Sequence, residues 1–144
     1  MIATVATGTE DSLFIGKPVE VSVTWKYDPA NPQGAGAWTI EPSEVTIDKK
    51  VAIITYTFTP DSTPGVRFAM GPDANEPSPV LWISPSNPDN FEVTVIDGGR
   101  SVLIADANET RGIDPQSFSF LLVAVYQDVT RISPDPTIIN KEPS

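Results

Sequence analysis

The chain has 144 residues and a formal net charge of -10, and it contains neither cysteine nor histidine. A surface this acidic repels phosphate backbones and anionic lipid, so neither nucleic acid nor a membrane is an expected partner. The missing residue types exclude disulfides, a thiol nucleophile, a Ser-His-Asp triad and histidine-bearing zinc sites. Carboxylate, hydroxyl, lysine and oxygen-ligand chemistry remain.

A chain of this length is expected to form one domain, residues 1–144. Abundant Val, Ile and Thr, sparse helix formers and 15 prolines predict an all-β fold. The N-terminus lacks the pattern of a secretory signal, and no apolar run approaches the ~20 residues of a membrane span. These features predict a cytoplasmic protein. Residues 2–7 alternate weakly, as in an edge strand, and residues 11–16 are typical of a turn.

Residues 19–27 place Val and aromatic side chains on one face and polar side chains on the other, which predicts a half-buried antiparallel strand. A Pro- and Gly-rich loop follows. Further strands are predicted at residues 38–40, 45–47 and 51–59. Residues 60–79 contain five prolines and predict irregular surface structure.

In the second half, residues 91–95 and 101–105 flank a Gly-Gly pair and predict a hairpin. Residues 118–126 are apolar on both alternating faces, so we expect a strand buried on both sides, with a sheet built around it. Residues 81–83 and the segment 129–140 add further strands. About eight strands at intervals of roughly ten residues predict an immunoglobulin-like antiparallel β-sandwich.

Three Asp-Pro bonds occur, beginning at Asp28, Asp114 and Asp135. An aspartate side chain can attack its own main-chain carbonyl, and the departing proline nitrogen is a secondary amine that protonates readily. A folded site that strains such a bond, supplies a proton or positions a water could promote its cleavage. By turn chemistry alone, however, an Asp-Pro pair more often simply opens a turn, because aspartate caps the turn and proline fixes its φ angle.

One of the three bonds lies in a longer motif near the C-terminus. Residues 133–143 read Ser-Pro-Asp-Pro-Thr-Ile-Ile-Asn-Lys-Glu-Pro and follow the apolar run. This pattern resembles the signature of the DP-EP family, small bacterial proteins that take their name from the dipeptides found here at Asp135-Pro136 and Glu142-Pro143. The resemblance implies a β-sandwich and, for some members, self-cleavage at the Asp-Pro bond by an aspartic-type endopeptidase mechanism.

For this chain, the resemblance implies that Asp135 supplies the scissile carbonyl and that Pro136 becomes the new amino terminus. The tail, residues 136–144, would stay docked on the sandwich, with Ile138 and Ile139 as its anchors. The expected binding partner of the sandwich is therefore its own C-terminal tail.

The carboxylate that would activate water is not marked by a motif. Asp106 and Asp128 are the candidates, because each lies at an end of a predicted strand near the apolar run, and Asp97 is a weaker third. Ordinary turns use aspartates in the same way. The predicted catalytic set is therefore Asp135, Asp106 and Asp128, with no cofactor and no metal. Lys141, the one lysine of the C-terminal half, gives little support to capture of an acyl intermediate by an amine.

Two other functions stay open. In a non-enzymatic structural or interaction module, the tail would pair along a sheet edge of its own molecule or of a neighbour, which leaves a homo-oligomer open. A calcium- or carbohydrate-binding domain is the weaker alternative. Residues 87–90 and 106–109 offer oxygen ligands without EF-hand spacing. Trp25, Trp38 and Trp82 could stack on sugars, although Trp25 is more typical of a core.

Overall fold

The structure is a computed structural model that describes residues 18–112 and 114–143. The expected edge strand at residues 2–7 and the turn at 11–16 lie outside the described residues. The described part contains eleven strands and two short 3-10 turns. In chain order these are β1 (Val19–Lys26), β2 (Ala37–Glu41), β3 (Glu44–Ile47), β4 (Val51–Phe58), β5 (Arg67–Phe68), η1 (Pro72–Ala74), β6 (Val80–Ser84), β7 (Phe91–Ile96), η2 (Asp97–Gly99), β8 (Ser101–Ala107), β9 (Gln116–Tyr126), β10 (Val129–Ile132) and β11 (Thr137–Asn140).

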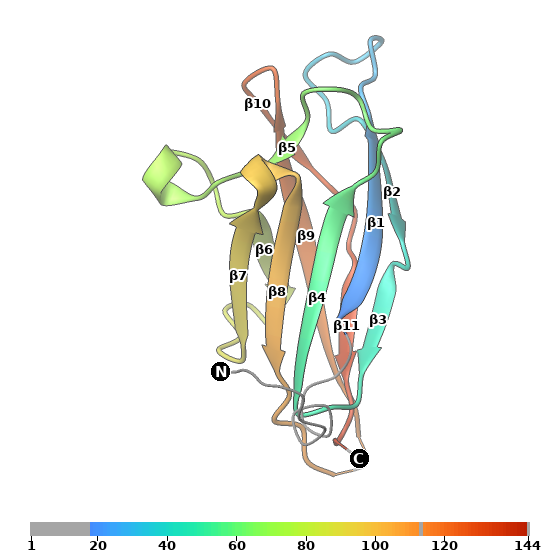
Figure 1. Ribbon diagram of the computed structural model, residues 1–144, viewed down its shortest axis with the longest axis vertical. Helices are drawn as coiled ribbons and strands as arrows, with labels where there is room; N and C mark the ends of the chain where they lie inside the picture. Colours follow the sequence, from blue (N-terminus) through green and yellow to red (C-terminus); the bar gives the residue numbers. More distant parts are fainter. Residues whose placement is uncertain (1–17, 113, 144) are drawn as a thin grey trace.

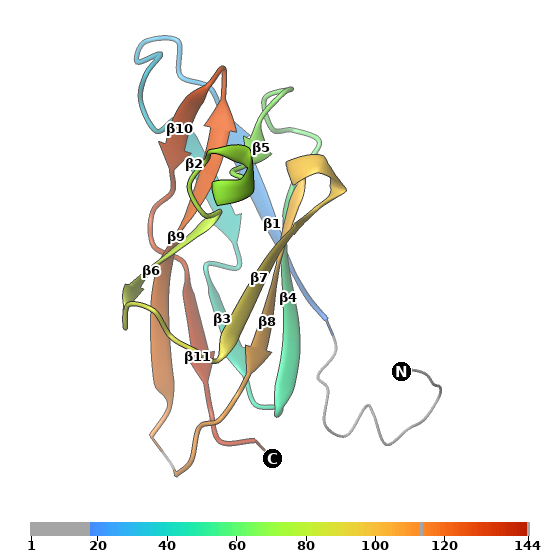
Figure 2. The same cartoon turned by 90° about the vertical axis from the view of Figure 1, so that its left-hand side faces the viewer.

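The strands form two sheets that pack face to face, as Figure 2 shows from the side. One sheet has the order β2-β1-β4-β8-β7. The other has the order β10-β9-β11-β3, and β5 and β6 also pair with β9. The expected all-β sandwich is confirmed, but two details of the prediction are wrong. The described residues form eleven strands rather than about eight, and both sheets are mixed, because β1 pairs with β4 and β11 pairs with β3 in parallel.

The alternating strands bury the side chains that their pattern predicts. In β1, Val21, Val23 and Trp25 are fully buried, while Glu20 and Ser22 on the other face are exposed. The hairpin of β7 and β8 is confirmed, and its turn is η2, where Gly98 takes the left-handed conformation that favours glycine. One main core fills the space between the sheets.

Strand β9 is the centre of the second sheet (Figure 1). It pairs with β10 and β11 along one side, and with β5 and β6 along the other. Phe118, Phe120 and Leu122 enter the main core. Val123 and Val125 point the opposite way and are buried with Ala69 in a second, smaller cluster. The prediction of a strand buried on both faces, with a sheet built around it, is therefore confirmed.

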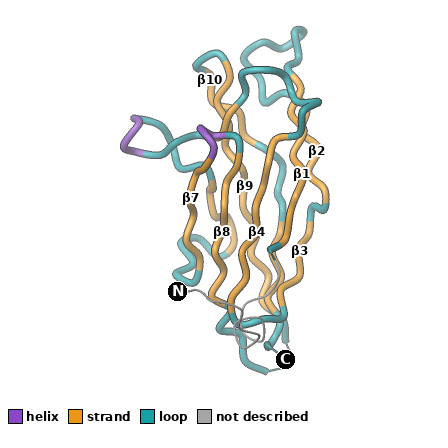
Figure 3. The backbone as a smooth tube through the Cα atoms, in the orientation of Figure 1, coloured by secondary structure: helices purple, strands orange, loops and turns teal. Residues whose placement is uncertain are grey.

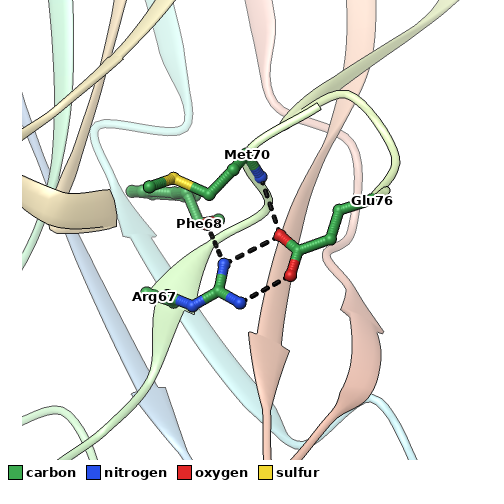
Figure 4. A network of polar contacts seen from close by, with 4 residues as sticks. All are labelled: Arg67, Phe68, Met70 and Glu76. Atoms are coloured by element: carbon green, nitrogen blue, oxygen red, sulfur yellow. Dashed lines mark hydrogen bonds and ion pairs between the residues drawn. The ribbon is translucent and has the colours of Figure 1, made fainter. Parts of the chain in front are cut away.

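Ala69, which packs against Val123 and Val125 on the outer face of β9, begins a segment at residues 69–79 that projects from the sandwich and carries η1 (Figure 3). Of the proline-rich region, the two residues of β5 join a sheet. Arg67 in β5 holds the segment by a two-bond contact to the carboxylate of Glu76, which also accepts a hydrogen bond from the backbone N–H of Met70 (Figure 4). The contact with Arg67 lowers the pKa of Glu76 to about 2.

Glu76→Gln is expected to lower the free energy of unfolding by about 1 kcal/mol at pH 7, the upper range for an ion pair that is partly exposed. The folded-state pKa lies below the ordinary value, so the contribution is present above pH ~4.5 and is lost as the pH falls through about 2. Urea unfolding at pH 7 and pH 2 checks this. Glu92→Gln, the same change at an exposed position of β7, is the matched control. Equal losses in both variants would contradict the expectation.

Candidate functional site

The Asp135-Pro136 bond lies in a β-bulge between β10 and β11. The two strands follow one another along the same side of β9, as seen in Figure 1 and Figure 2. Ile132 pairs with Val123, and the next strand pair is Thr137 with Ser119. Four residues therefore lie between these pairs on the tail side and three on β9. One extra residue on one strand defines a bulge, a feature that is frequent next to active sites.

The sequence of the bulge explains why the ladder is interrupted. Proline has no N–H to donate, and two of the four residues are prolines. The Ser133 hydroxyl fills part of the gap: it accepts a hydrogen bond from the Leu122 N–H at 2.8 Å and donates one to the Pro134 carbonyl at 2.8 Å. Pairing resumes where Phe120 N–H donates to the Pro136 carbonyl at 3.2 Å. The Asp135-Pro136 bond thus joins an exposed aspartate to a buried proline.

The tail strand β11 is held on both of its edges. It lies between β9, to which it is antiparallel, and β3, to which it is parallel. Ile138 is fully buried in the main core, whereas Ile139 points to the outer face and is half-buried. After the strand, the Lys141 N–H donates to the Ile47 carbonyl at 2.8 Å. The tail is an internal strand of the sheet rather than an addition to its edge.

Strand β3, which pairs with β11 beside the Asp135-Pro136 bond, carries a carboxylate that the sequence did not indicate. Glu44 pairs with Thr137 in the parallel register, and the Thr137 N–H donates to the Ser43 carbonyl at 2.9 Å. Glu44 is exposed and lies on the outer face, the face opposite to the buried Val45. No local pattern could have indicated Glu44, because β3 and β11 pair although they lie far apart in the sequence.

Asp106 lies at the far end of β11. It is fully buried in β8, and its Oδ1 accepts hydrogen bonds from Asn140 Nδ2 at 2.9 Å and from Asn90 Nδ2 at 3.4 Å. Burial raises the pKa of Asp106 to about 6, although these two hydrogen bonds act in the opposite direction. The five steps from Asp135 to Asn140 span roughly 16 Å of extended chain. Asp106 therefore contacts the tail, but not at the Asp135-Pro136 bond.

Asp128 lies in the other direction, in the tight turn between β9 and β10, where Gln127 and Asp128 both have positive φ angles. The pKa of Arg67 is raised mainly by its hydrogen bond to Glu76 and in smaller part by the charge of Asp128. The whole of β10 separates Asp128 from Asp135. The structure does not bring Asp135, Asp106 and Asp128 together, and Asp97 lies in the turn between β7 and β8.

Few features of the structure support the alternative functions of calcium or carbohydrate binding. Within residues 18–112 and 114–143, no group of three or more acidic side chains is arranged to hold a metal ion. Trp25 is buried, as predicted, and Trp82 stacks on Phe91 at a ring distance of 4.5 Å. The same part of the chain contains no helix both long and apolar enough to cross a bilayer.

Comparison with known proteins agrees with the motif at the C-terminus. No curated protein matches the chain. The model of the DP-EP family matches residues 15–142, which is most of the chain and includes the Asp135-Pro136 bond and all eleven strands. The chain therefore belongs to the DP-EP family.

Proposed function

We propose that this protein hydrolyses its own Asp135-Pro136 bond and keeps the severed tail as strand β11. The observation that carries the proposal is the position of the bond. It lies in a bulge in which Asp135 is exposed and Pro136 is buried, directly before a strand that is paired on both edges and anchored by the buried Ile138. Hydrolysis at this point would cut the chain without removing a strand from the sheet.

The chemistry uses the side chain of Asp135 itself. Its carboxylate attacks the main-chain carbonyl carbon of the same residue, the C–N bond to Pro136 breaks, and the proline nitrogen takes up a proton. A water molecule then opens the cyclic anhydride, which restores the side-chain carboxylate and leaves a new α-carboxylate. The overall reaction consumes one water for one peptide bond. Asp135 is exposed, so water can reach it.

A second carboxylate can accept the proton of the attacking water. Glu44 is the residue that we propose for this role, because the register places it beside the residue that follows Pro136. The distances along the chain make Asp128 and Asp106 less suited to act on that water. Asp106 instead contacts the tail strand at Asn140, which suits a role in holding the tail.

Asp135→Ala is expected to abolish cleavage, because it removes the attacking carboxylate. Intact-mass measurement under denaturing conditions, over days at pH 5 to 7, should show loss of the nine residues 136–144 from the unmodified chain and a single unbroken mass from the variant. Asp28→Ala and Asp114→Ala change the other two Asp-Pro bonds and serve as matched controls that should still cleave. Glu44→Gln should slow cleavage by about 100-fold.

Size-exclusion chromatography of the same samples tests retention of the tail. Under native conditions, the cleaved tail should elute with the rest of the chain. An unmodified chain that keeps a single unbroken mass would overturn the proposal. If that chain also assembled through its tail, the non-enzymatic module would be the better description, with β11 completing the sheet of its own molecule or of a neighbour.

A further inference from the structure

Buried polar side chains gather between the two sheets at the C-terminal end of β11. Asp106 of β8 and Asn140 of β11 are both fully buried, and they belong to opposite sheets. Asn108 donates from Nδ2 to the Lys141 carbonyl at 2.7 Å and to the Ile47 carbonyl at 3.3 Å. Such a cluster between packed sheets costs free energy unless its members are paired.

Asp106 and Asn140 are joined by one hydrogen bond where their shapes allow two. Asn140 Nδ2 donates to Asp106 Oδ1 at 2.9 Å. The second oxygen of each group, Asp106 Oδ2 and Asn140 Oδ1, is buried and has no hydrogen-bond partner in the described chain. Both atoms are acceptors when the carboxyl is ionised, so they cannot pair with each other. A proton on Oδ2 turns that atom into a donor for Oδ1 and satisfies both.

We propose that Asp106, when it is protonated in the folded protein, clasps Asn140 through two hydrogen bonds, so that retention of the C-terminal strand depends on pH. Asp106 is thus a positioning residue for the tail. Its role in retaining a cleaved tail rests on the proposed self-cleavage, but the clasp itself also exists in an uncleaved chain.

The surroundings of Asp106 favour the neutral acid. Its neighbours across the sheet are Ala52 of β4 and Phe91 of β7, neither of which carries a charge. Asn90, its other hydrogen-bond donor, lines a cleft of about 550 Å³ through which a proton can exchange with solvent. The charged residues of the adjoining segments are each at least partly exposed; they are Asp48, Lys49, Lys50, Asp89, Glu109 and Lys141.

The direction of the pH dependence follows from the raised pKa. Asp106 titrates near pH 6 when folded and near its ordinary value of 3.8 when unfolded. Folding is therefore accompanied by uptake of a proton when the pH lies between these two pKa values. The stabilisation is fully present below pH ~4 and is lost as the pH rises through about 6.

The test uses the Asp135→Ala chain, which cannot cleave, so its outcome is independent of the proposed reaction. Two quantities are measured from pH 4.5 to 8: the carbon-13 shift of the Asp106 carboxyl, and hydrogen exchange of the β11 amides corrected for the intrinsic rate. We expect the carboxyl to titrate near pH 6. Protection of the Thr137 and Lys141 amides should fall by about 30-fold from pH 4.5 to 8, since the pKa rises from 3.8 to about 6 on folding and part of the change lies below pH 4.5.

Two variants separate the clasp from simple packing. Asp106→Asn replaces the acid by a carboxamide, which can form both hydrogen bonds at every pH, so its protection should be independent of pH. Asp106→Leu forms neither bond and should lose protection at every pH. A carboxyl that is still ionised at pH 4.5, or a pH dependence that survives in Asp106→Asn, would overturn the proposal. Protection that follows added Na⁺ or Ca²⁺ instead of pH would also overturn it.

Discussion

Arg131→Leu is expected to lower the free energy of unfolding by about 3–5 kcal/mol, because it leaves several backbone carbonyls without their donor and creates a space in the interior. Arg131 in β10 is 1% exposed, although its neighbours Thr130 and Ile132 are exposed. Its guanidinium donates from Nη1 to the Pro32 and Gly34 carbonyls at 2.9 and 2.6 Å, and from Nη2 to the Tyr126 carbonyl at 3.1 Å. These bonds tie the loop between β1 and β2 to the β9–β10 turn.

Aromatic rings complete the enclosure of this guanidinium. Its central carbon lies 5.4 Å from the ring centre of Trp25, 5.8 Å from that of Tyr27 and 5.6 Å from that of Tyr126. Desolvated cation–π contacts contribute about 2 kcal/mol or more. Leucine would leave three carbonyls without their donor and a space that its shorter side chain cannot fill.

Urea unfolding at pH 7 measures the loss. Arg100→Leu makes the same chemical change and the same charge change at an exposed position, and it should stay within about 0.5 kcal/mol of the unmodified chain. The loss in Arg131→Lys should lie between the losses in Arg131→Leu and Arg100→Leu. The lysine ammonium keeps the charge, but it cannot donate to carbonyls on both sides of the enclosure. A loss below 1 kcal/mol in Arg131→Leu would contradict the network described here.

Periodicity predicted the parts of this fold in which the neighbours of a residue along the chain determine its environment. The alternation in β1 and the two apolar faces of β9 follow from that rule, and both are confirmed. The parallel pairing of β1 with β4 does not, because pairing partners distant in the chain leave no local pattern. The segment at residues 129–140 shows the same limit. It was predicted as one strand, but its two prolines divide it into β10 and β11.

The candidate site, too, could be predicted from the sequence only in part. The motif marked the Asp135-Pro136 bond, and the chain order placed it after the central strand. Neither could bring Glu44 to the outer face beside the tail, or Asn140 against Asp106, because each contact joins strands that are far apart in the chain. The burial of Arg131 could not be predicted either, since a charged residue in a polar segment normally indicates an exposed position.

Ending the chain at Asp135 is expected to remove more than about 5 kcal/mol from the free energy of unfolding, which approaches the whole stability of a small protein. Burial of Ile138 alone contributes about 1.5–3 kcal/mol. Loss of β11 also separates β3 from β9 and leaves two unpaired strand edges within the sheet. Without Asn140, Asp106 keeps a buried carboxyl with one fewer donor. The shortened chain should therefore show no cooperative unfolding transition in urea.

A synthetic peptide of residues 136–144 should restore the transition, because the slot between β9 and β3 binds the strand on both edges and needs no covalent link at Asp135. Two altered peptides provide a matched pair. Ile138→Asn places a carboxamide in the main core and should not restore folding, whereas Ile139→Asn changes a half-buried position on the outer face and should still do so. Circular dichroism during peptide titration measures both. Equal rescue by the two altered peptides would show that burial of Ile138 does not hold the tail, and a stable shortened chain without peptide would show that the sheet does not need β11.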